Sequence, residues 1–380
     1  MVYDVIIVGA GSMGMAAGYY LAKEGNKVLM LDAFTPPHEE GSHHGDTRII
    51  RFAYGEGASY VPFVKRAGEL WQELESLANE NLFLQTGVVN IGEPTCDFIQ
   101  NVKASSALYD LALEHYSATE AMNKWPGLFL PEDLVACFEP TAGVLRVEAC
   151  IQAYKKLTLE AGASLQTNEK VLAIQAGEIV QVQTVHNLYK AKHLIVTAGA
   201  WATELLQTMG VTIPVTPTRK TFAWFEADEE LYRDENFPAY CFEFADSTYY
   251  GFPSIDGAGL KLGRHDGGEV INPNTPLRPF DDADLVDLQN FIHQFMPKHG
   301  AIKYGKTCKY SMTPDEDFII DFLPKHQNII IAAGFSGHGF KFSSAVGEVL
   351  AELIVDGKSK QDLSTFKLNR FLKNKDWYNA

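Results

Sequence analysis

The chain has 380 residues, which suggests about two domains and is long enough to bury a large core. Hydrophobic residues make up 46% of the sequence and charged residues 21%, so the composition is that of an ordinary folded protein and excludes a disordered or fibrous one. The net charge of −16, without a compensating basic cluster, argues against nucleic acid or an anionic membrane surface as a partner.

Five cysteines are scattered along the chain, an odd number with no Cys-x-x-Cys pair that would indicate zinc or a dithiol centre. We therefore expect free thiols and no metal site. The N-terminus lacks the basic segment of a secretion signal, and no apolar run approaches the roughly 18 residues that a membrane helix requires. The sequence thus predicts a cytoplasmic protein without membrane partners.

The N-terminal segment predicts a strand, a tight turn and a helix. An apolar run over residues 5–8 leads into Gly9-x-Gly11-x-x-Gly14, and a helical pattern follows over residues 15–24. In this motif Gly9 permits the turn, Gly11 lets the backbone approach a pyrophosphate, and Gly14 lets helix and strand pack closely. The free N–H groups at the start of the helix would bind the anion.

A second strand, over residues 27–31, follows Gly25 and ends in Asp32. Gly25 stands where a helix C-cap glycine is expected. Asp32 stands near the offset of about 20 residues at which an acid accepts hydrogen bonds from an adenosine ribose. An acid at this position disfavours the 2′-phosphate of NADP, so the motif indicates NAD or FAD without separating the two.

Two later segments, residues 193–209 and 328–355, repeat the pattern of a strand followed by small residues and a helix. Both are predicted to join the nucleotide-binding sheet. Other segments, separated by Gly and Pro turns, predict a largely antiparallel second sheet and an amphipathic helix. The expected strands are residues 218–226, 249–253 and 259–263, and the expected helix is residues 281–296.

The predicted fold class is α/β, or α+β overall, with a Rossmann-like dinucleotide-binding domain and a second, mainly antiparallel-sheet substrate domain. The first domain is predicted to be assembled from the discontinuous segments 1–84, 145–215 and 315–380. The second is predicted to comprise residues 85–144 and 216–314.

The run Gly41-Ser-His-His-Gly-Asp-Thr-Arg-Ile-Ile-Arg51 carries two histidines, an aspartate and two arginines soon after the ribose-binding strand. With the motifs at both ends of the chain, it resembles the monomeric sarcosine oxidase and N-methyltryptophan oxidase family of flavoenzymes. The resemblance covers nearly the whole chain and implies FAD rather than NAD, hence an FAD-binding domain. Further matches are Tyr249-Tyr-Gly-Phe-Pro253, Gly259-Leu-Lys-Leu-Gly263 with His265, Cys308-x-Tyr310, Pro314-Asp-Glu-Asp-Phe-Ile-Ile-Asp321 and Gly334-Phe-Ser-Gly-His-Gly-Phe-Lys341.

The resemblance implies that FAD is covalently bound through the sulfur of Cys308 to the 8α-methyl of the flavin ring. Without it, a lone cysteine is more often a small buried residue. The other cofactor-binding residues that it implies lie in the glycine turns and the polar loop, and they are Gly9, Gly11, Ser12, Met13, Gly14, Asp32, His43, Thr47, Gly199 and Gly337.

The resemblance also implies catalytic roles for Lys261, His265, Arg48, Tyr250 and His44. Lys261 would hold a positive charge where oxygen is reduced, whereas its two leucine neighbours alone indicate a solvent-facing lysine in an alternating strand. Arg48 and His44 would lie beside the flavin and favour its anionic reduced form. His265 and Tyr250 would border the substrate amine.

For the substrate, the resemblance implies that Arg51 and Lys341 bind a carboxylate, with Tyr310 and His338 completing the pocket. On the residues alone, the favoured interpretation is a surface ion-pair residue for Arg51 and a solvated lysine at a helix start for Lys341. Cys241 stands where we expect sarcosine oxidases to carry a methionine that lines the cavity, and the smaller side chain would enlarge the pocket.

The implied reaction oxidises the N-methyl group of a secondary amino acid to an imine, which water hydrolyses to formaldehyde and the demethylated amino acid, while oxygen becomes hydrogen peroxide. Sarcosine, which yields glycine, is the expected substrate; N-methyl-L-tryptophan or another bulkier N-alkyl amino acid is the alternative. An NAD-linked dehydrogenase and a non-catalytic flavin-binding protein are the alternatives from other classes. The expected partners are the N-methyl amino acid and O2, and the protein is expected to be a monomer.

Overall fold

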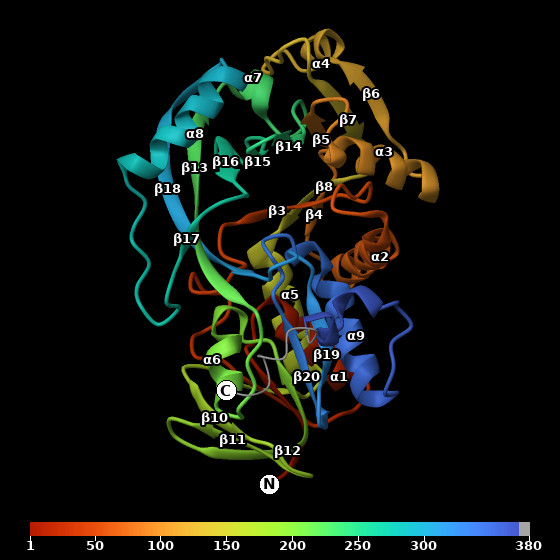
Figure 1. Cartoon of the computed structure of the whole chain (residues 1–380), viewed down its shortest axis with the longest axis vertical. Coiled ribbons are helices and arrows are strands. Elements are labelled where there is room, and N and C mark those ends of the chain that lie inside the picture. The colour runs from red at the N-terminus through yellow and green to blue at the C-terminus, as the bar shows by residue number, and fades with distance from the viewer. Residues whose placement is uncertain (372–380) are drawn as a thin grey trace.

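The computed structural model describes residues 1–371, which form two large sheets, one in each half of the molecule, with a small sheet between them (Figure 1). The first sheet is Rossmann-like, with a parallel core and an antiparallel edge. Its strands, from one edge to the other, are β9 (Ser164–Gln166), β2 (Val28–Leu31), β1 (Tyr3–Val8), β12 (Leu188–Val196), β20 (His326–Ala333) and antiparallel β19 (Ile319–Leu323). The antiparallel strands β10 (Val171–Gln175) and β11 (Val180–Thr184) extend from the first half of β12.

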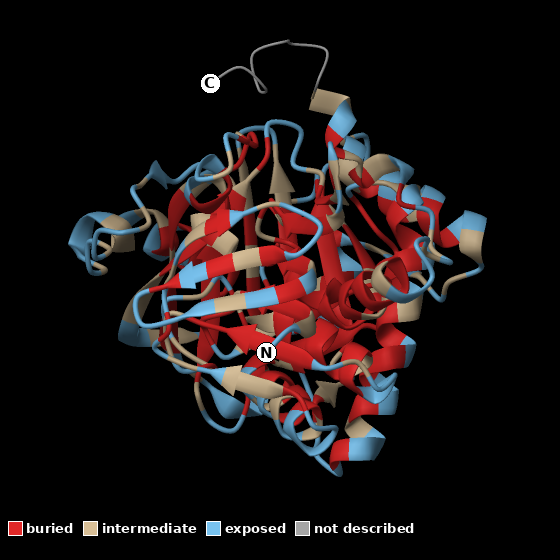
Figure 2. Ribbon diagram, turned by 90° about the horizontal axis from the view of Figure 1, so that it is seen from below, coloured by how far each residue is buried: buried red, intermediate tan, exposed pale blue. Residues whose placement is uncertain are grey.

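Both faces of the parallel strands are buried, as is usual when helices and loops cover a parallel sheet on both sides. Ile7 and Met30 pack against one group of helices, while Ile6 and Leu29 pack on the opposite side. Figure 2 shows this buried interior behind strands in which exposed and buried residues alternate. The helices are α1 (Ser12–Lys23), α2 (Val61–Ala78), α5 (Val147–Glu160) and α9 (Ser343–Val355) on the first side and α6 (Ala202–Gln207) on the other.

The glycine turn between β1 and α1 confirms the predicted strand, turn and helix. Gly9 has a φ of 95°, in the left-handed region that glycine tolerates. A Cβ atom on Gly14 would lie 1.9 Å from the carbonyl oxygen of Gly9 and 2.8 Å from Oγ1 of Thr197, so only glycine allows this approach of helix and strand. Gly25 ends the helix with a φ of 82°, as predicted for a C-cap glycine.

The second sheet is antiparallel apart from the parallel pair β5 and β14, which confirms the mainly antiparallel prediction. The order is β6 (Glu114–Ser117), β7 (Val135–Glu139), β5 (Val88–Gly92), β14 (Ala239–Phe244), β15 (Ser247–Phe252), β16 (Leu260–Arg264), β13 (Thr216–Ala227) and β18 (His299–Met312), with β17 (Glu269–Val270) beside the start of β13.

The two faces of this sheet have opposite character. Leu260 and Leu262 pack with α8 (Asp282–Phe295) on the outer face, whereas Lys261 faces inward. The solvent-facing interpretation of Lys261 is wrong, because only 2% of the residue is exposed. Alternation of polar and apolar residues indicates a solvent-exposed face only where nothing covers the polar side, and here the first half of the molecule covers it.

The small sheet lies between the two large ones in Figure 1. Its strands are β3 (Thr47–Ile50), β8 (Gly143–Arg146) and β4 (Phe83–Leu84), and the remaining helices are α3 (Asp97–Tyr109), α4 (Ala118–Lys124) and α7 (Glu229–Tyr232). The boundaries of the two domains stay a prediction. No helix among residues 1–371 has the length and apolar character needed to cross a membrane.

Gly14→Ala tests the close packing at the glycine turn. We expect it to lower the free energy of unfolding by about 3 kcal/mol, because the methyl group meets backbone atoms that cannot move aside independently. Gly11→Ala is the matched control, since its Cβ would lie 3.5 Å from Nδ1 of His43, an ordinary contact. Thermal unfolding of both variants checks the prediction, and equal midpoints would contradict it.

Candidate active site

A cavity of about 470 Å³ opens where the parallel strands of the first sheet end. Four lining residues belong to the carboxyl edge of the first sheet, because each directly follows a parallel strand. They are Gly9 after β1, Asp32 after β2, Thr197 after β12 and Gly334 after β20. Ligands of open parallel sheets bind at this edge. The cavity therefore lies where the sequence predicts a dinucleotide.

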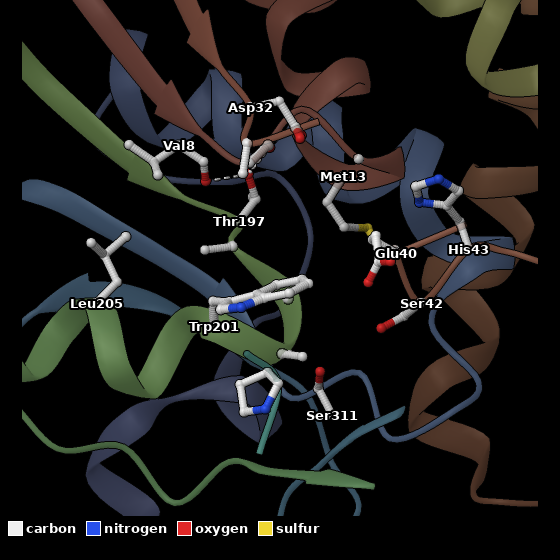
Figure 3. Close-up of a pocket in the computed structure, with 18 of the residues that line it drawn as sticks. Val8, Met13, Asp32, Glu40, Ser42, His43, Thr197, Trp201, Leu205 and Ser311 are labelled. Atoms are coloured by element: carbon white, nitrogen blue, oxygen red, sulfur yellow. Dashed lines mark hydrogen bonds between the residues drawn. The ribbon is translucent and has the colours of Figure 1, made fainter. Parts of the chain in front are cut away.

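Most of the predicted cofactor-binding residues line the cavity, and Figure 3 shows Met13, Asp32 and His43 at its wall. Three other cofactor candidates do not line the cavity. Gly14 packs behind the turn, whereas Thr47 and Cys308 lie near Lys261. Arg48 and Tyr310, which were predicted for catalysis and substrate binding, also line the cavity. The cofactor candidates in the lining are Gly9, Gly11, Ser12, Met13, Asp32, His43, Gly199 and Gly337.

The lining fits an anionic dinucleotide. Gly11 begins α1 without a side-chain cap, so the amides at the helix start are available to a phosphate. Asp32 is fixed by the backbone amides of Ala10 and Phe34, each donating to its carboxylate at 2.8 Å. Four buried atoms of the lining have no hydrogen-bond partner among residues 1–371, as expected of groups that contact a polar ligand: both ring nitrogens of His38, Nε2 of His43 and Oγ of Ser311.

Carbonyl groups of the polar loop over residues 41–51 accept hydrogen bonds from two basic side chains, one from the loop and one from β16. Arg48 donates to the carbonyls of Ser42 at 3.0 Å, His44 at 2.6 Å and Thr47 at 2.8 Å. Lys261 donates to the carbonyl of Gly45 and to Oγ1 of Thr47, the latter at 3.1 Å. The structure thus brings Lys261, Arg48 and Thr47 together.

Lys261 lies in an aromatic cage. Its Nζ is 4.9 Å from the ring centre of Phe222, 5.1 Å from that of Trp224 and 4.7 Å from that of Phe252. Burial holds the pKa of Lys261 well below its usual value, and the adjacent positive charge of Arg48 acts in the same direction. The ring faces and the three oxygen atoms of the loop offset part of this cost.

Cys308 lies on the same inner face, paired in register with Lys220. Only 1% of Cys308 is exposed, and burial raises the pKa of its thiol, whereas the charges of Arg48 and Lys261 oppose that rise. His44 is also buried, with its ring 6.1 Å from that of Phe222, and burial lowers its pKa.

A second group of predicted residues meets around Arg51. Its Nη2 donates to both carboxylate oxygens of Glu56 at 2.6 Å, and its Nη1 donates to Sγ of Cys241 at 3.4 Å. The guanidinium also stacks on the ring of Tyr54, 5.2 Å from its centre. The surface ion-pair interpretation of Arg51 is wrong, because Arg51 is only 6% exposed.

Lys341 joins this group through Tyr54. Its Nζ donates to the hydroxyl of Tyr54 at 3.3 Å and to the carbonyl of His338 at 2.9 Å, and Nδ1 of His338 lies 2.8 Å from the same hydroxyl. The solvated interpretation of Lys341 is wrong, since it is 5% exposed. Burial and the charge of Arg51 lower the pKa of Lys341 to about 7, and burial lowers that of His338 to about 3.

Glu56 was missed in the sequence analysis, although it follows Arg51 by only five positions. Burial alone would raise its pKa, but the positive charge of Arg51 outweighs that effect and holds the pKa far below the usual value. An ionised carboxylate therefore already lies on Arg51. The hydrogen bonds between Arg51 and Glu56 indicate how the carboxylate of a ligand would bind to Arg51.

His265 stands beside two tyrosines, with ring centres 5.7 Å from Tyr310 and 6.5 Å from Tyr250. Burial lowers the pKa of His265 to about 4 and raises that of Tyr250 to about 12, so both are neutral at physiological pH. Lys220, also missed, donates to the carbonyl of His265 at 2.6 Å, and burial lowers its pKa to about 8. A lysine in a strand carries no signal by itself that its ammonium group is buried.

The fold and the cavity at the carboxyl edge of the first sheet are those of a dinucleotide-dependent enzyme. Residues 4–353 match the family model described as FAD dependent oxidoreductase. The chain belongs to this family and is a flavin-dependent oxidoreductase, which confirms FAD as the cofactor expected in place of NAD.

Two curated relatives match almost the whole chain. It is 47% identical over 374 residues to the monomeric sarcosine oxidase of Bacillus sp. (strain NS-129), with 97% of each chain covered. It is 44% identical over 375 residues to the N-methyl-L-tryptophan oxidase of Yersinia pestis (strain Pestoides F), with 98% of this chain and 100% of the relative covered. The family resemblance inferred from the motifs is thus confirmed.

Solved structures confirm the fold class. L-proline dehydrogenase from P. horikoshii has a TM-score of 0.87 at 23% identity, with 98% of both chains covered. Glycine oxidase from Geobacillus kaustophilus has a TM-score of 0.81 at 20% identity, with 97% of this chain and 98% of that chain covered. At these identities the likeness concerns the fold alone.

Glu56→Gln removes the carboxylate that competes for Arg51. We expect acetate to bind about tenfold more tightly, because it no longer displaces an ion pair. Thermal stability should fall at the same time, since the buried guanidinium of Arg51 loses its counterion. Titration followed by flavin absorbance measures the affinity, and Glu235→Gln, at an exposed glutamate, is the control. Unchanged acetate affinity in Glu56→Gln would contradict the competition.

The charge of Lys341 should make carboxylate binding depend on pH. Because its pKa is lowered to about 7, the ammonium form dominates below that pH and is lost above it. We expect acetate affinity to be constant near pH 6 and to fall, approaching about tenfold per pH unit, above pH 7. In Lys341→Met the affinity should be weak and should not change over this range; a profile identical to that of the unmodified protein would contradict the assignment.

Proposed function

We propose that the protein is an oxidase that acts on the CH–NH group of an N-methyl amino acid, with sarcosine as the first substrate and O2 as the electron acceptor. The observation that carries this proposal is the buried pair of cations, Arg51 and Lys341, joined through Tyr54. Such a pair selects a carboxylate, and the protein as a whole repels anions. The names of the two curated relatives support an N-methyl amino acid.

The substrate carboxylate would replace that of Glu56 on Arg51 and accept a hydrogen bond from Lys341. Arginine offers two parallel N–H donors, whereas the lysine ammonium acts as a compact point charge. Together they fix one end of the substrate, so that its amine and N-methyl group have a defined orientation.

The substrate amine would lie towards His265 and Tyr250. Both side chains are neutral near pH 7, so they can accept or donate hydrogen bonds without adding charge. The cations that hold the carboxylate disfavour a second positive charge nearby and thereby lower the pKa of the substrate amine. The amine can then lose its proton without a dedicated carboxylate base.

When bound, FAD accepts the hydride equivalent that the substrate loses and passes it to oxygen, which yields hydrogen peroxide. Its phosphates would lie at the start of α1 beside Gly11, Ser12 and Met13, and its ribose at Asp32. His43, Thr47, Gly199 and Gly337 would complete its site, and Arg48 and His44 would supply positive charge or hydrogen bonds on the flavin side.

A bulkier N-methyl amino acid, such as N-methyl-L-tryptophan, is the second candidate substrate. Cys241 favours it, because this small side chain contacts Arg51 and leaves more room than the methionine expected in a sarcosine oxidase.

We further propose a monomeric protein in the cytoplasm. The word monomeric in the relative's name supports the first point, and the free state of all five cysteines fits a reducing compartment.

The experiment that tests this function mixes the purified protein with sarcosine or N-methyl-L-tryptophan in the absence of air and follows the flavin absorbance. Rapid bleaching by one substrate, with recovery and peroxide formation after air is admitted, is the expected result. A yellow protein that neither substrate bleaches would contradict the assignment to these two amino acids.

Cys308→Ser tests the proposed covalent bond to FAD. Serine does not form the thioether, so we expect flavin to leave the variant when it is denatured and to stay with the unmodified protein. Cys150→Ser, at a buried cysteine in α5, is the matched control and should retain the flavin. Flavin that stays with denatured Cys308→Ser would place the bond elsewhere.

Lys261→Met tests the proposed role of this ammonium group in oxygen reduction. We expect reoxidation by air to slow by about 100-fold, with reduction by substrate changed far less, because the positive charge acts where oxygen gains electrons. Lys220→Met removes another buried ammonium group of the same sheet and should not slow reoxidation to this extent. Stopped-flow absorbance separates the two half-reactions; rapid reoxidation in Lys261→Met would contradict the role.

A further inference from the structure

A loop of the second sheet closes part of the FAD cavity. It joins β17 to α8 over residues 271–281 and runs towards α6 of the first half of the molecule (Figure 1). Its residues 273–276 line the cavity beside Lys170 and Trp201, and the ring centre of Trp201 lies 5.9 Å from that of Phe34, which follows Asp32 by two positions. This is the nucleotide end of the cavity, because Asp32 is the predicted ribose ligand.

Both ends of this loop are fixed to β13. The backbone amide of Ile271 donates to the carbonyl of Pro217 at 3.0 Å. The buried guanidinium of Arg219 donates to the carbonyls of Arg278 at 2.9 Å and Pro279 at 3.1 Å. Prolines recur at every third position between these attachments, and each restricts the backbone. Residues 271–279, between these attachments, therefore form a stiff segment with two fixed ends, which we call the strap.

The tip of the strap is held by one side chain, that of Asn274. Its Oδ1 accepts hydrogen bonds from Nε1 of Trp201 at 3.1 Å and from Nζ of Lys170 at 3.2 Å, and its Nδ2 donates to Glu204 at 2.6 Å. All three partners belong to the first half of the molecule and line the cavity. Asn274 is exposed, so water can replace these bonds and the tip can open.

The strap also orients a wall of the cavity. Figure 3 shows the ring of Trp201 lying across the cavity from Met13 and Glu40. Nζ of Lys309 lies 4.8 Å from the centre of this ring and forms an ion pair with Glu40, whose side chain is half exposed. With Asn274 bound to its Nε1, the Trp201 ring is held from two directions.

We propose that residues 271–279 are a strap that closes the nucleotide end of the FAD cavity, and that Asn274 is the positioning residue that keeps it closed. FAD enters and leaves when the three bonds of Asn274 open. The cofactor is thus retained at both ends, by the strap at the nucleotide and, on the function proposed above, by Cys308 at the flavin.

The test measures release of FAD from Cys308→Ser protein, in which the cofactor is free to leave, by the rise of flavin fluorescence after dilution. Adding Asn274→Ala should speed release about tenfold, because three hydrogen bonds to the strap are lost. Trp201→Phe, which keeps a ring but loses one of those bonds, should speed it less. Asn236→Ala is the control, since this exposed asparagine bonds to Glu230 in the second sheet's region and lies outside the cavity lining.

A purely structural role of Asn274 predicts a different result. It would lower the thermal stability of the flavin-free protein, whereas a strap changes the release rate and leaves that stability within the range of the Asn236→Ala control. Equal release rates in Asn274→Ala and the control would overturn the strap while leaving FAD and its site in place. Failure of every variant, and of the unmodified protein, to hold flavin would overturn the strap and the proposed function together.

Discussion

Positive charge buried without a counterion is the constraint on which the site depends. Lys220, Lys261 and Lys341 are each at most 5% exposed, and none forms an ion pair with a carboxylate among residues 1–371. An unpaired buried ammonium group costs several kcal/mol, which carbonyl oxygens and ring faces offset only in part. An anionic ligand beside these groups would therefore be stabilised, and we propose that it binds at Arg51 in exchange for the carboxylate of Glu56.

The alternation of the second sheet creates this arrangement. One face, with Leu260 and Leu262, packs on α8 and supplies the hydrophobic stability of that half. The opposite face carries Lys261, Tyr250 and Cys308 and is covered by the loops at the edge of the first sheet. Because both faces are covered, polar groups that a strand normally presents to water become a desolvated site between the two sheets.

Much of the fold follows from local patterns in the sequence. The glycines of the first turn, the apolar runs of the parallel strands and the turn residues of the second sheet each depend on near neighbours, and the structure has these elements within a few residues of their predicted limits. The burial of Lys261 and the contact of Arg51 with Cys241 depend on segments far apart in the chain coming together. No local pattern records such contacts, so their roles came from the family resemblance, and Lys220, Glu56 and Asn274 were found only in the structure.

Our central proposal is that Arg51 and Lys341 form a carboxylate site, at which the carboxylate of a ligand replaces that of Glu56. The most direct measurement is a crystal structure of the flavin-loaded protein with acetate bound. The account predicts a carboxylate in hydrogen-bond contact with both cations and Glu56 moved off Arg51. Acetate bound elsewhere, with Glu56 still paired to Arg51, would contradict it.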